Sequence, residues 1–261
     1  MKLAFSTLGC PDWSLKYAVE QAEKLGFQSI EIRGIRDNLR ADTIEELLPE
    51  KREKSLRYAE EKGIVFCGLN SSASFHEKEK RKQNTEETLA TVKLASECNI
   101  PYVRIFGNNL ITENEDAEIA DIGSCVKLLC EEACKLNVGI LLEVHGDFNT
   151  SARILKLAEA VNADNFGVIW DIQHSREDFK LFYENIRHLI RHVHIKDSIN
   201  GNLCSTGEGS LPVTEIVRML KNDGYDGYFS LEWEKRWHPE LRSPEEEFPH
   251  YVKLMKQYLT D

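Results

Sequence analysis

The sequence predicts an α/β protein, a single (β/α)8 barrel with a core of eight parallel strands. Short apolar runs alternate with helical patterns eight times along 261 residues, and such barrels are typically about 250 residues long. Several of the runs are apolar throughout, as strands covered on both faces must be. No G-x-G-x-x-G turn follows the first run, so an open dinucleotide-binding sheet is not favoured. No linker interrupts the pattern, and we expect one domain over residues 1–261.

The first half of the chain contains four predicted strands and the helices between them. Ser14 can cap the first helix, and Gly26 and Gly63 can end the first two, because glycine readily adopts the left-handed conformation found at helix C-termini. The third helix is indicated by the spacing of its apolar residues. We expect strands at 3–8, 29–33, 64–70 and 102–107, and helices at 14–25, 43–62 and 84–98.

The second half repeats the pattern with runs that are apolar almost to their ends. We expect strands at 139–144, 166–171, 192–196 and 228–233, and helices at 115–136, 150–163, 177–190, 212–222 and 245–259. Two stretches are too long and too polar to be simple connections, and we predict that they are active-site loops. They read NSSASFHEKEKRKQN after the third strand and DSINGNLCSTGEGS after the seventh.

The composition excludes several classes of function. The chain is 41% hydrophobic and 30% charged, with a net charge of -11, which is ordinary for a globular protein and unfavourable for binding nucleic acid. No run approaches the roughly 20 apolar residues of a membrane helix, and the first residues do not read as a signal peptide. The seven cysteines form no C-x-x-C pair, which favours reduced thiols. We therefore expect a cytoplasmic protein.

Four consecutive strands of the second half end on residues that bind divalent metal ions. They are Glu143, Asp171, His194 and Glu232. One such residue alone would be unremarkable, because strand-end polar groups often make hydrogen bonds of their own. The carboxyl ends of all barrel strands meet at one end of the barrel, so four together predict one metal site. Carboxylates with one imidazole suit an open, catalytic site for Mn, Mg, Co or Zn, whereas a structural zinc site would favour thiolates.

Other polar residues near these strand ends are candidates for binding substrate. His174 follows Asp171 by three residues, and we expect it to contact substrate rather than metal. Lys196 can contact an anionic or hydroxyl group, and the N–H groups of GEGS at 207–210 can face an anion. Arg104 and Glu208 are further candidates for recognising a polar substrate. For Arg104 an ion pair within the barrel is an equally open alternative.

One more histidine is expected in the interior. His192 precedes His194 by two residues, so both point to the same side of their strand. If that side is the interior, His192 lies one layer deeper and is hydrogen-bonded there.

Two of the predicted ligands could also transfer protons. When a 2-hydroxy ketone chelates the ion, the metal stabilises the enediolate formed as a proton leaves the carbon next to the carbonyl. One carboxylate can take this proton and another, on the opposite face, can return it. Glu143 and Glu232 are the candidates for these catalytic roles.

The chain resembles the xylose isomerase-like barrels grouped as sugar phosphate isomerases/epimerases. The resemblance covers the whole chain and is carried by PDWSLKYAVEQAEKLGFQSIEIRG, LLEVHGD, WDIQH, HVHIKDS, GEGS and SLEWE. It implies a metal-dependent isomerase or epimerase of a small sugar, sugar phosphate or related polyol ketone in carbohydrate metabolism. It also implies the four metal ligands above, with Glu143 and Glu232 as acid-base residues and His174 at the substrate.

Several alternatives stay open within and beyond this family. An inosose-type dehydratase would use the same site, and a non-catalytic metal or sugar binding protein would need no proton shuttle. An endonuclease IV-like DNA repair enzyme is disfavoured, because its extra histidines are missing from RIFGNN and STGEGS. Asn149 and Asn200 stand where 3-epimerases of the family usually carry glutamate and arginine, which disfavours a free-ketose 3-epimerase. The expected partner is a small carbohydrate, and a homo-oligomer is left open.

Overall fold

The computed structural model describes residues 2–260 and confirms the predicted α/β barrel. Eight parallel strands form a closed barrel in the order β1-β10-β7-β6-β5-β4-β3-β2. In the described residues, eight α-helices alternate with these strands along the chain. The chain divides into two compact units, one formed by the residues up to Cys67 and from His192 onward and the other by Gly68–Arg191. The expectation of a single domain stays a prediction.

The first unit holds the beginning and the end of the barrel. Strand β1 pairs in parallel with β2 and β10, and β10 pairs with β7. The strands are β1 (Lys2–Ser6), β2 (Ser29–Ile32), β10 (Tyr228–Leu231) and the part of β7 (Ile190–Ile195) from His192 onward. The helices are α1 (Leu15–Leu25), α2 (Pro49–Glu61), α7 (Val213–Asn222) and α8 (Pro244–Thr260).

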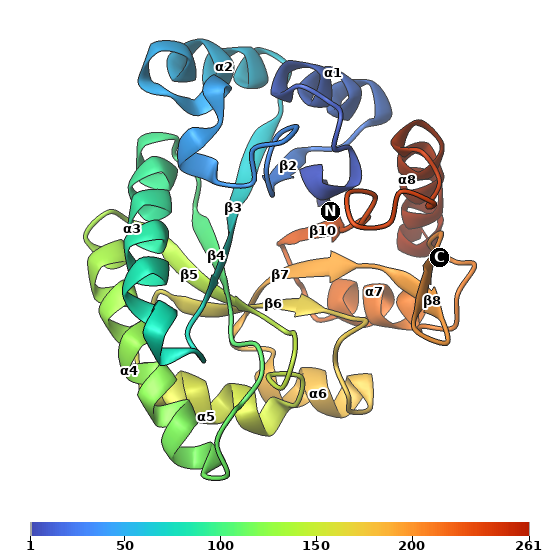
Figure 1. The fold of residues 1–261 in the computed structure, drawn as a ribbon. Coiled ribbons are helices and arrows are strands. Elements are labelled where there is room, and N and C mark those ends of the chain that lie inside the picture. The colour runs from blue at the N-terminus through green and yellow to red at the C-terminus, as the bar shows by residue number, and fades with distance from the viewer. Residues whose placement is uncertain (1, 261) are drawn as a thin grey trace. The chain divides into compact units, whose positions relative to one another are not determined.

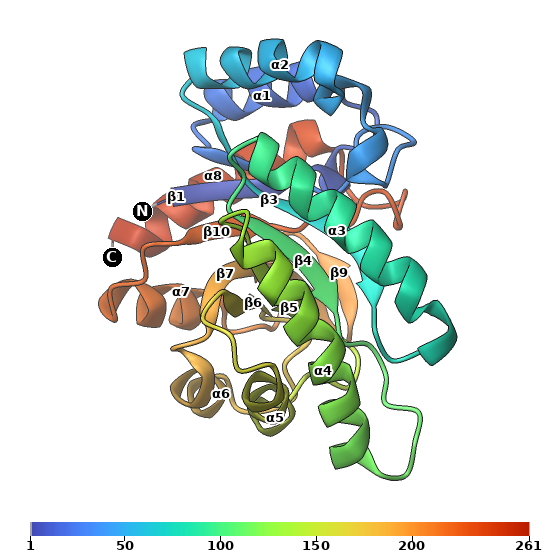
Figure 2. The same cartoon turned by 90° about the vertical axis from the view of Figure 1, so that its left-hand side faces the viewer.

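An aromatic cluster joins β1 to the last helix in this unit. The ring centroid of Phe5 lies 4.9 Å from that of Phe27 and 4.6 Å from that of Phe248 on α8. Phe248 also contacts Trp13, at 5.5 Å. The Phe5–Phe27 and Trp13–Phe248 pairs are edge-to-face and the Phe5–Phe248 pair is tilted. Aromatic rings bury large apolar areas and favour edge-to-face contacts. The cluster therefore packs α8 against β1, and the two elements lie beside each other in Figure 2.

The second unit holds the middle of the barrel. Strand β4 pairs in parallel with β3 and β5, and β5 pairs with β6. Figures 1 and 2 show α4 between α3 and α5, outside β4 and β5. The strands are β4 (Tyr102–Phe106), β5 (Gly139–Glu143), β6 (Phe166–Asp171) and the part of β3 (Val65–Ser74) from Gly68 onward. The helices are α3 (Arg81–Glu97), α4 (Glu115–Cys134), α5 (Ser151–Val161) and α6 (Phe179–Ile186).

The structure corrects three of the predicted boundaries. Helix α2 begins at Pro49 rather than at residue 43, because proline suits the first turn of a helix and two short 3-10 turns occupy residues 41–47. Helix α6 ends at Ile186 rather than 190, because residues 190–191 already belong to β7. Strand β3 continues to Ser74, into a segment predicted to be loop.

The predicted loop after the seventh strand contains a small hairpin. Its strands are β8 (Asp197–Ile199) and β9 (Asn202–Cys204), which pair antiparallel. The two residues between them, Asn200 and Gly201, have φ angles of 53° and 82°. Tight two-residue hairpin turns need positive φ and favour asparagine followed by glycine. The turn thus accounts for an asparagine at position 200.

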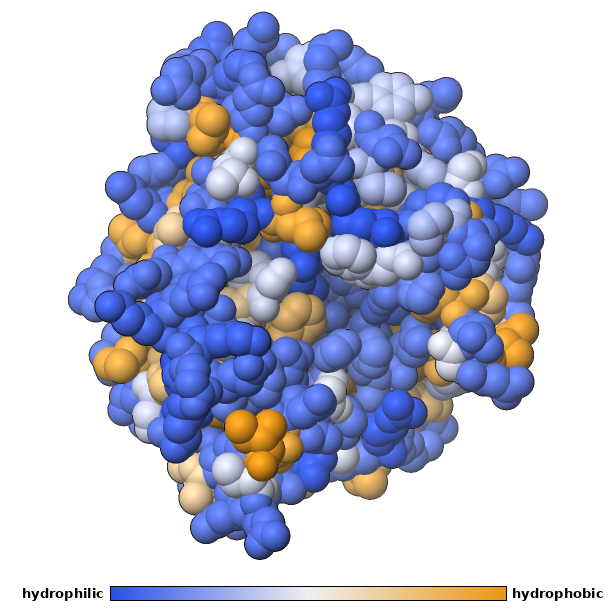
Figure 3. Space-filling model, viewed as in Figure 1, coloured by the Kyte–Doolittle hydropathy of each residue, from blue (hydrophilic) through white to orange (hydrophobic). Residues whose placement is uncertain are grey.

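The surface agrees with the charged composition. Figure 3 shows hydrophilic side chains over most of the face in view, with apolar residues scattered among them. Among residues 2–260, no helix combines the length and apolar character that crossing a membrane would require.

We predict that Gly123→Ala destabilises the protein through the contact between α4 and α5. A Cβ atom at Gly123 would lie 2.5 Å from the Cβ of Ala160, and overpacking of this kind typically costs about 1–3 kcal/mol. The gain in helix propensity is at most about 1 kcal/mol, so the clash should dominate. Urea unfolding measures the difference, with Ser124→Ala at the exposed neighbouring position as the control. A Gly123→Ala variant as stable as the parent would contradict this packing.

Candidate functional site

The four predicted metal ligands all lie at the carboxyl ends of barrel strands. Glu143 and Asp171 are the last residues of β5 and β6, His194 is the next to last of β7, and Glu232 directly follows β10. All four are at most 2% exposed. Their strands are consecutive in the barrel order, β5-β6-β7-β10. Two of the residues belong to each compact unit.

In the second unit, Glu143 is held by a buried arginine. Nη1 of Arg104, on β4, donates to Oε2 of Glu143 at 2.5 Å, and Nη2 donates to the carbonyl of Ser71 at 2.9 Å. The guanidinium also lies 4.1 Å from the ring centroid of Phe106. Both charged side chains are almost inaccessible to water. An unpaired charge in such a buried position would be very costly in free energy. Of the two alternatives for Arg104, the structure shows the ion pair within the barrel.

Asp171 lies near one end of a row of three rings. Phe106 is the last residue of β4, His145 follows β5 and His174 follows β6. Oδ1 of Asp171 accepts the backbone N–H of Gln173 at 2.9 Å, and its Oδ2 lies 3.8 Å from Nε2 of His174. The ring centroid of His174 lies 4.6 Å from that of His145, which lies 5.2 Å from that of Phe106. The sequence analysis missed His145, although its spacing of two residues from Glu143 was a signal. The half-buried His174 can reach a bound molecule.

In the first unit, a glutamate that the sequence analysis also missed contacts both histidines of β7. Nε2 of His194 lies 2.9 and 3.0 Å from the two oxygens of Glu31, on β2. Nε2 of His192 lies 3.2 Å from Glu31 Oε2, to which the hydroxyl of Ser230 donates at 2.8 Å. His192 is therefore buried and hydrogen-bonded, as expected. A single glutamate in the otherwise apolar run SIEIR was the available signal for Glu31.

The two histidines change the ionisation of Glu31. Burial alone would raise the pKa of this carboxyl. Electrostatic attraction to His194 and His192 and the hydrogen bonds from both rings oppose the effect of burial and hold the pKa of this carboxyl well below the ordinary value. Glu31 is therefore a carboxylate at neutral pH and accepts hydrogen bonds from both rings.

The other nitrogen of His194 faces Glu232. Nδ1 of His194 lies 3.1 Å from Oε2 of Glu232. When the ring proton of His194 is on Nε2, towards Glu31, Nδ1 carries a lone pair. A cation placed between this lone pair and the carboxylate oxygen of Glu232 would be bound by both. Adjacent ligands of an octahedral ion with bonds of about 2.1 Å are about 3 Å apart. These two residues therefore fit a divalent ion.

A buried lysine holds Glu232 much as Arg104 holds Glu143. Nζ of Lys196 lies 2.7 Å from Oε2 of Glu232 and 2.5 Å from Oε1 of Glu234. The lysine is only 3% exposed, so its charge depends on these carboxylates. Two ion pairs thus fix the ammonium group of Lys196, which is one of the predicted substrate contacts.

The glycine-rich stretch after the hairpin binds a carboxylate of the chain itself. The N–H groups of Gly207 and Gly209 donate to Oδ2 of Asp197 at 2.9 and 3.0 Å. The interpretation of GEGS as a cradle for an external anion is therefore wrong for these two groups. Glu208 is exposed and lies 2.9 Å from Arg242.

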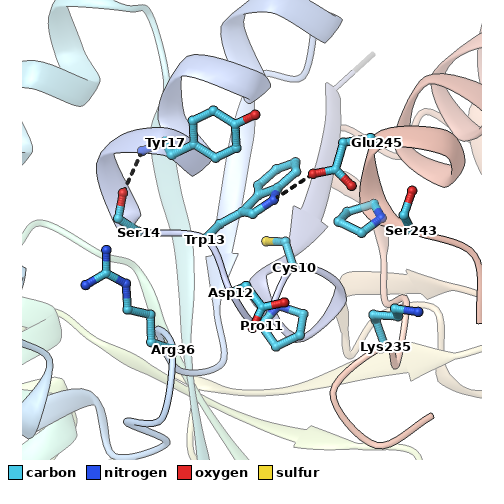
Figure 4. A pocket seen from close by; sticks show the side chains of 11 residues that line it. Cys10, Pro11, Asp12, Trp13, Ser14, Tyr17, Arg36, Lys235, Ser243 and Glu245 are labelled. Atoms are coloured by element: carbon cyan, nitrogen blue, oxygen red, sulfur yellow. Dashed lines mark hydrogen bonds between the residues drawn. The ribbon is translucent and has the colours of Figure 1, made fainter. Parts of the chain in front are cut away.

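A polar pocket in the first unit is lined by segments that follow β1, β2 and β10 (Figure 4). Nε1 of Trp13 donates to Glu245 at 3.1 Å on one wall. Arg36 and Lys235 lie on opposite sides of the pocket, with Asp12 between them. The pocket offers charges of both signs and an indole ring, which suits a small polar molecule. The pocket was not predicted from the sequence, because its lining comes from three separate parts of the chain.

Comparisons with known proteins agree with this fold. The family described as "Xylose isomerase-like TIM barrel" matches residues 19–258. An inosose isomerase of Halalkalibacterium halodurans is 27% identical over 239 residues, which cover 82% of this chain and 80% of that protein.

Two solved structures share the fold at lower sequence identity. The probable 3-DHS dehydratase AsbF from Bacillus anthracis matches with a TM-score of 0.83 and 18% identity, covering 98% of this chain and 99% of that one. The IOLI protein with a binding zinc atom, for which no organism is given, matches with a TM-score of 0.80 and 21% identity. This match covers 100% of this chain and 98% of that one.

We predict that Arg104→Met strongly destabilises the metal-free protein. The substitution keeps apolar bulk but leaves the Glu143 carboxylate buried without its guanidinium, and breaking a buried pair typically costs about 3–5 kcal/mol. Arg40→Met is the matched control, because Arg40 pairs with Asp42 on the surface, where a pair contributes at most about 1 kcal/mol. Urea unfolding compares the two. Equal losses of stability would show that Arg104 and Glu143 are not a buried pair.

Proposed function

Because the chain belongs to the xylose isomerase-like TIM barrel family, we propose that it is a divalent-metal-dependent isomerase or epimerase. The proposed substrate is a small sugar, sugar phosphate or related polyol ketone. One observation carries the proposal: two buried strand-end glutamates, Glu143 and Glu232, are each held by a cation. The 27% identical inosose isomerase supports the reaction class.

The proposed metal ligands are the four strand-end residues. Their consecutive strands and the 3.1 Å separation of His194 Nδ1 and Glu232 Oε2 support one shared ion. The similar IOLI protein, described with a zinc atom, supports a metal in this fold. We propose Mn, Mg, Co or Zn, which all accept mixed carboxylate and imidazole ligands. A bound divalent ion would stabilise the negative charge that develops on the oxygens of a 2-hydroxy ketone.

The proposed proton transfers use Glu143 and Glu232. Two strands separate β5 from β10 in the barrel order, so their carboxylates can approach a substrate from different sides. One glutamate takes the proton from the carbon next to the carbonyl. The other glutamate, which starts the turnover as the carboxylic acid, donates its own proton and becomes a carboxylate. The proton goes to the neighbouring carbon in an isomerisation, or to the opposite face of the same carbon in an epimerisation, and exchange with solvent restores the two starting forms. Arg104 and Lys196 fix the positions of the two carboxyl groups through their ion pairs.

The remaining candidates are proposed to bind substrate. Arg104 and Lys196 would contact substrate oxygens beside the glutamates that they hold. His174, at the end of the row formed by Phe106, His145 and His174, would contact the substrate because its ring is only half-buried. Glu208 would contact the substrate from the exposed loop after the hairpin.

A dehydratase acting at the same site is the second candidate function. The probable 3-DHS dehydratase AsbF, with its TM-score of 0.83, supports it. Both reactions begin with abstraction of the same proton, and the dehydratase then expels a hydroxyl group. The experiment is incubation of the Mn-loaded protein in deuterated water with a panel of ketoses, their phosphates and inososes. We expect deuterium in a product that has lost no water, whereas loss of water would establish the dehydratase.

We predict that Glu143→Gln and Glu232→Gln each lower turnover of the substrate found in that panel by about 10²- to 10⁴-fold, the usual contribution of acid-base catalysis. Glutamine keeps the size of the side chain but cannot transfer the proton. The control is Glu118→Gln, which changes a buried glutamate that accepts the backbone N–H groups of Ile111 and Thr112. Normal turnover by either site variant would contradict the proton shuttle.

A further inference from the structure

We infer that Glu31 is a positioning residue for the metal site, and that it fixes the tautomer and ring orientation of His194. This inference rests on the proposed function, because it assigns a role toward the proposed metal. Nothing in the sequence pattern of strand-end ligands pointed to Glu31, which lies on β2 rather than on any strand that carries a ligand. The contacts of its carboxylate carry the inference.

The first step concerns the proton on the His194 ring. Nε2 lies within hydrogen-bond distance of both oxygens of Glu31, at 2.9 and 3.0 Å. An ionised carboxylate only accepts hydrogen bonds, so Nε2 must carry the proton that it donates. In the neutral ring Nδ1 is then left as the nitrogen with a lone pair. That nitrogen is the one 3.1 Å from Glu232.

The second step concerns ring orientation. The ring of His192 stands nearly perpendicular to that of His194, at 86°, with the centroids 5.4 Å apart. Glu31 also accepts hydrogen bonds from His192 and from the hydroxyl of Ser230. The carboxylate is therefore held by groups from β7 and β10 and cannot follow His194 if that ring rotates. Carboxylates behind metal-binding histidines commonly act in this way, and their loss typically costs about 10- to 100-fold in metal affinity.

A second metal site is the competing interpretation of the same three residues. Glu31, His192 and His194 offer ligand atoms within 4.8 Å of one another. However, their separations of 2.9 to 3.2 Å match ordinary hydrogen bonds. An ion at Nε2 would also displace the proton from that nitrogen. If Nδ1 binds the proposed metal at the same time, the His194 ring would then carry no proton and would be an anion. The hydrogen-bonded arrangement is therefore favoured, and the experiment separates the two.

The experiment compares the wild-type protein, Glu31→Gln and a matched control without and with Mn²⁺. The control is Glu247→Gln, because Glu247 is a fully buried glutamate on α8 that accepts the N–H of Thr206. Nitrogen-15 NMR of the metal-free proteins reports the tautomer of His194. Calorimetric titration with Mn²⁺ reports affinity and stoichiometry.

We expect His194 of the metal-free wild type to carry its proton on Nε2, and Mn²⁺ to bind with about one equivalent. Glu31→Gln should populate both tautomers and bind Mn²⁺ about 10- to 100-fold more weakly, while Glu247→Gln should match the wild type in both respects. Protonation of wild-type His194 on Nδ1 would overturn the inference, and this result needs no variant.

Two further outcomes separate this inference from the proposed function. Unchanged Mn²⁺ affinity in Glu31→Gln would overturn the positioning role and leave the proposed metal site intact. Two equivalents of Mn²⁺ in the wild type that fall to one in Glu31→Gln would establish Glu31 as a ligand instead. A wild-type protein that binds no Mn²⁺ would overturn the proposed function and this inference with it.

Discussion

A charge buried in a protein interior must be paired, and this constraint decides what the strand ends of this barrel can carry. Glu143 is buried with Arg104, Glu232 with Lys196, and Glu31 with two histidines. Each of these sets of partners lies within one compact unit. Without these partners, burial would drive the carboxyls towards their neutral form and remove their value as ligands or bases.

The same pairs give the residues different chemical roles. Arg104 and Lys196 hold Glu143 and Glu232, which we propose transfer protons. Glu31 holds His194, which we propose only binds metal. Asp171 has a backbone N–H and a distant imidazole near its oxygens, which suits a plain ligand.

The sequence predicted the fold and the strand-end residues because both follow from local patterns. Continuous apolar runs ending in Glu, Asp or His reveal a strand and its carboxyl end without knowledge of tertiary contacts. The partner of each charge is not local: Arg104 lies 39 residues before Glu143, and Glu31 lies 163 residues before His194. The number of alternative partners at such separations is large, which is why Arg104 was left open and Glu31 was missed. The hairpin was missed because its strands are only three residues long.

The most direct test of the account is a crystal structure of the Mn²⁺-soaked protein with anomalous diffraction data at the manganese edge. The account predicts one strong peak bound by Glu143, Asp171, Glu232 and Nδ1 of His194, with Glu31 hydrogen-bonded to Nε2. A peak bound by Nε2 of His194 and Glu31, or the absence of any peak at the four strand ends, would contradict it.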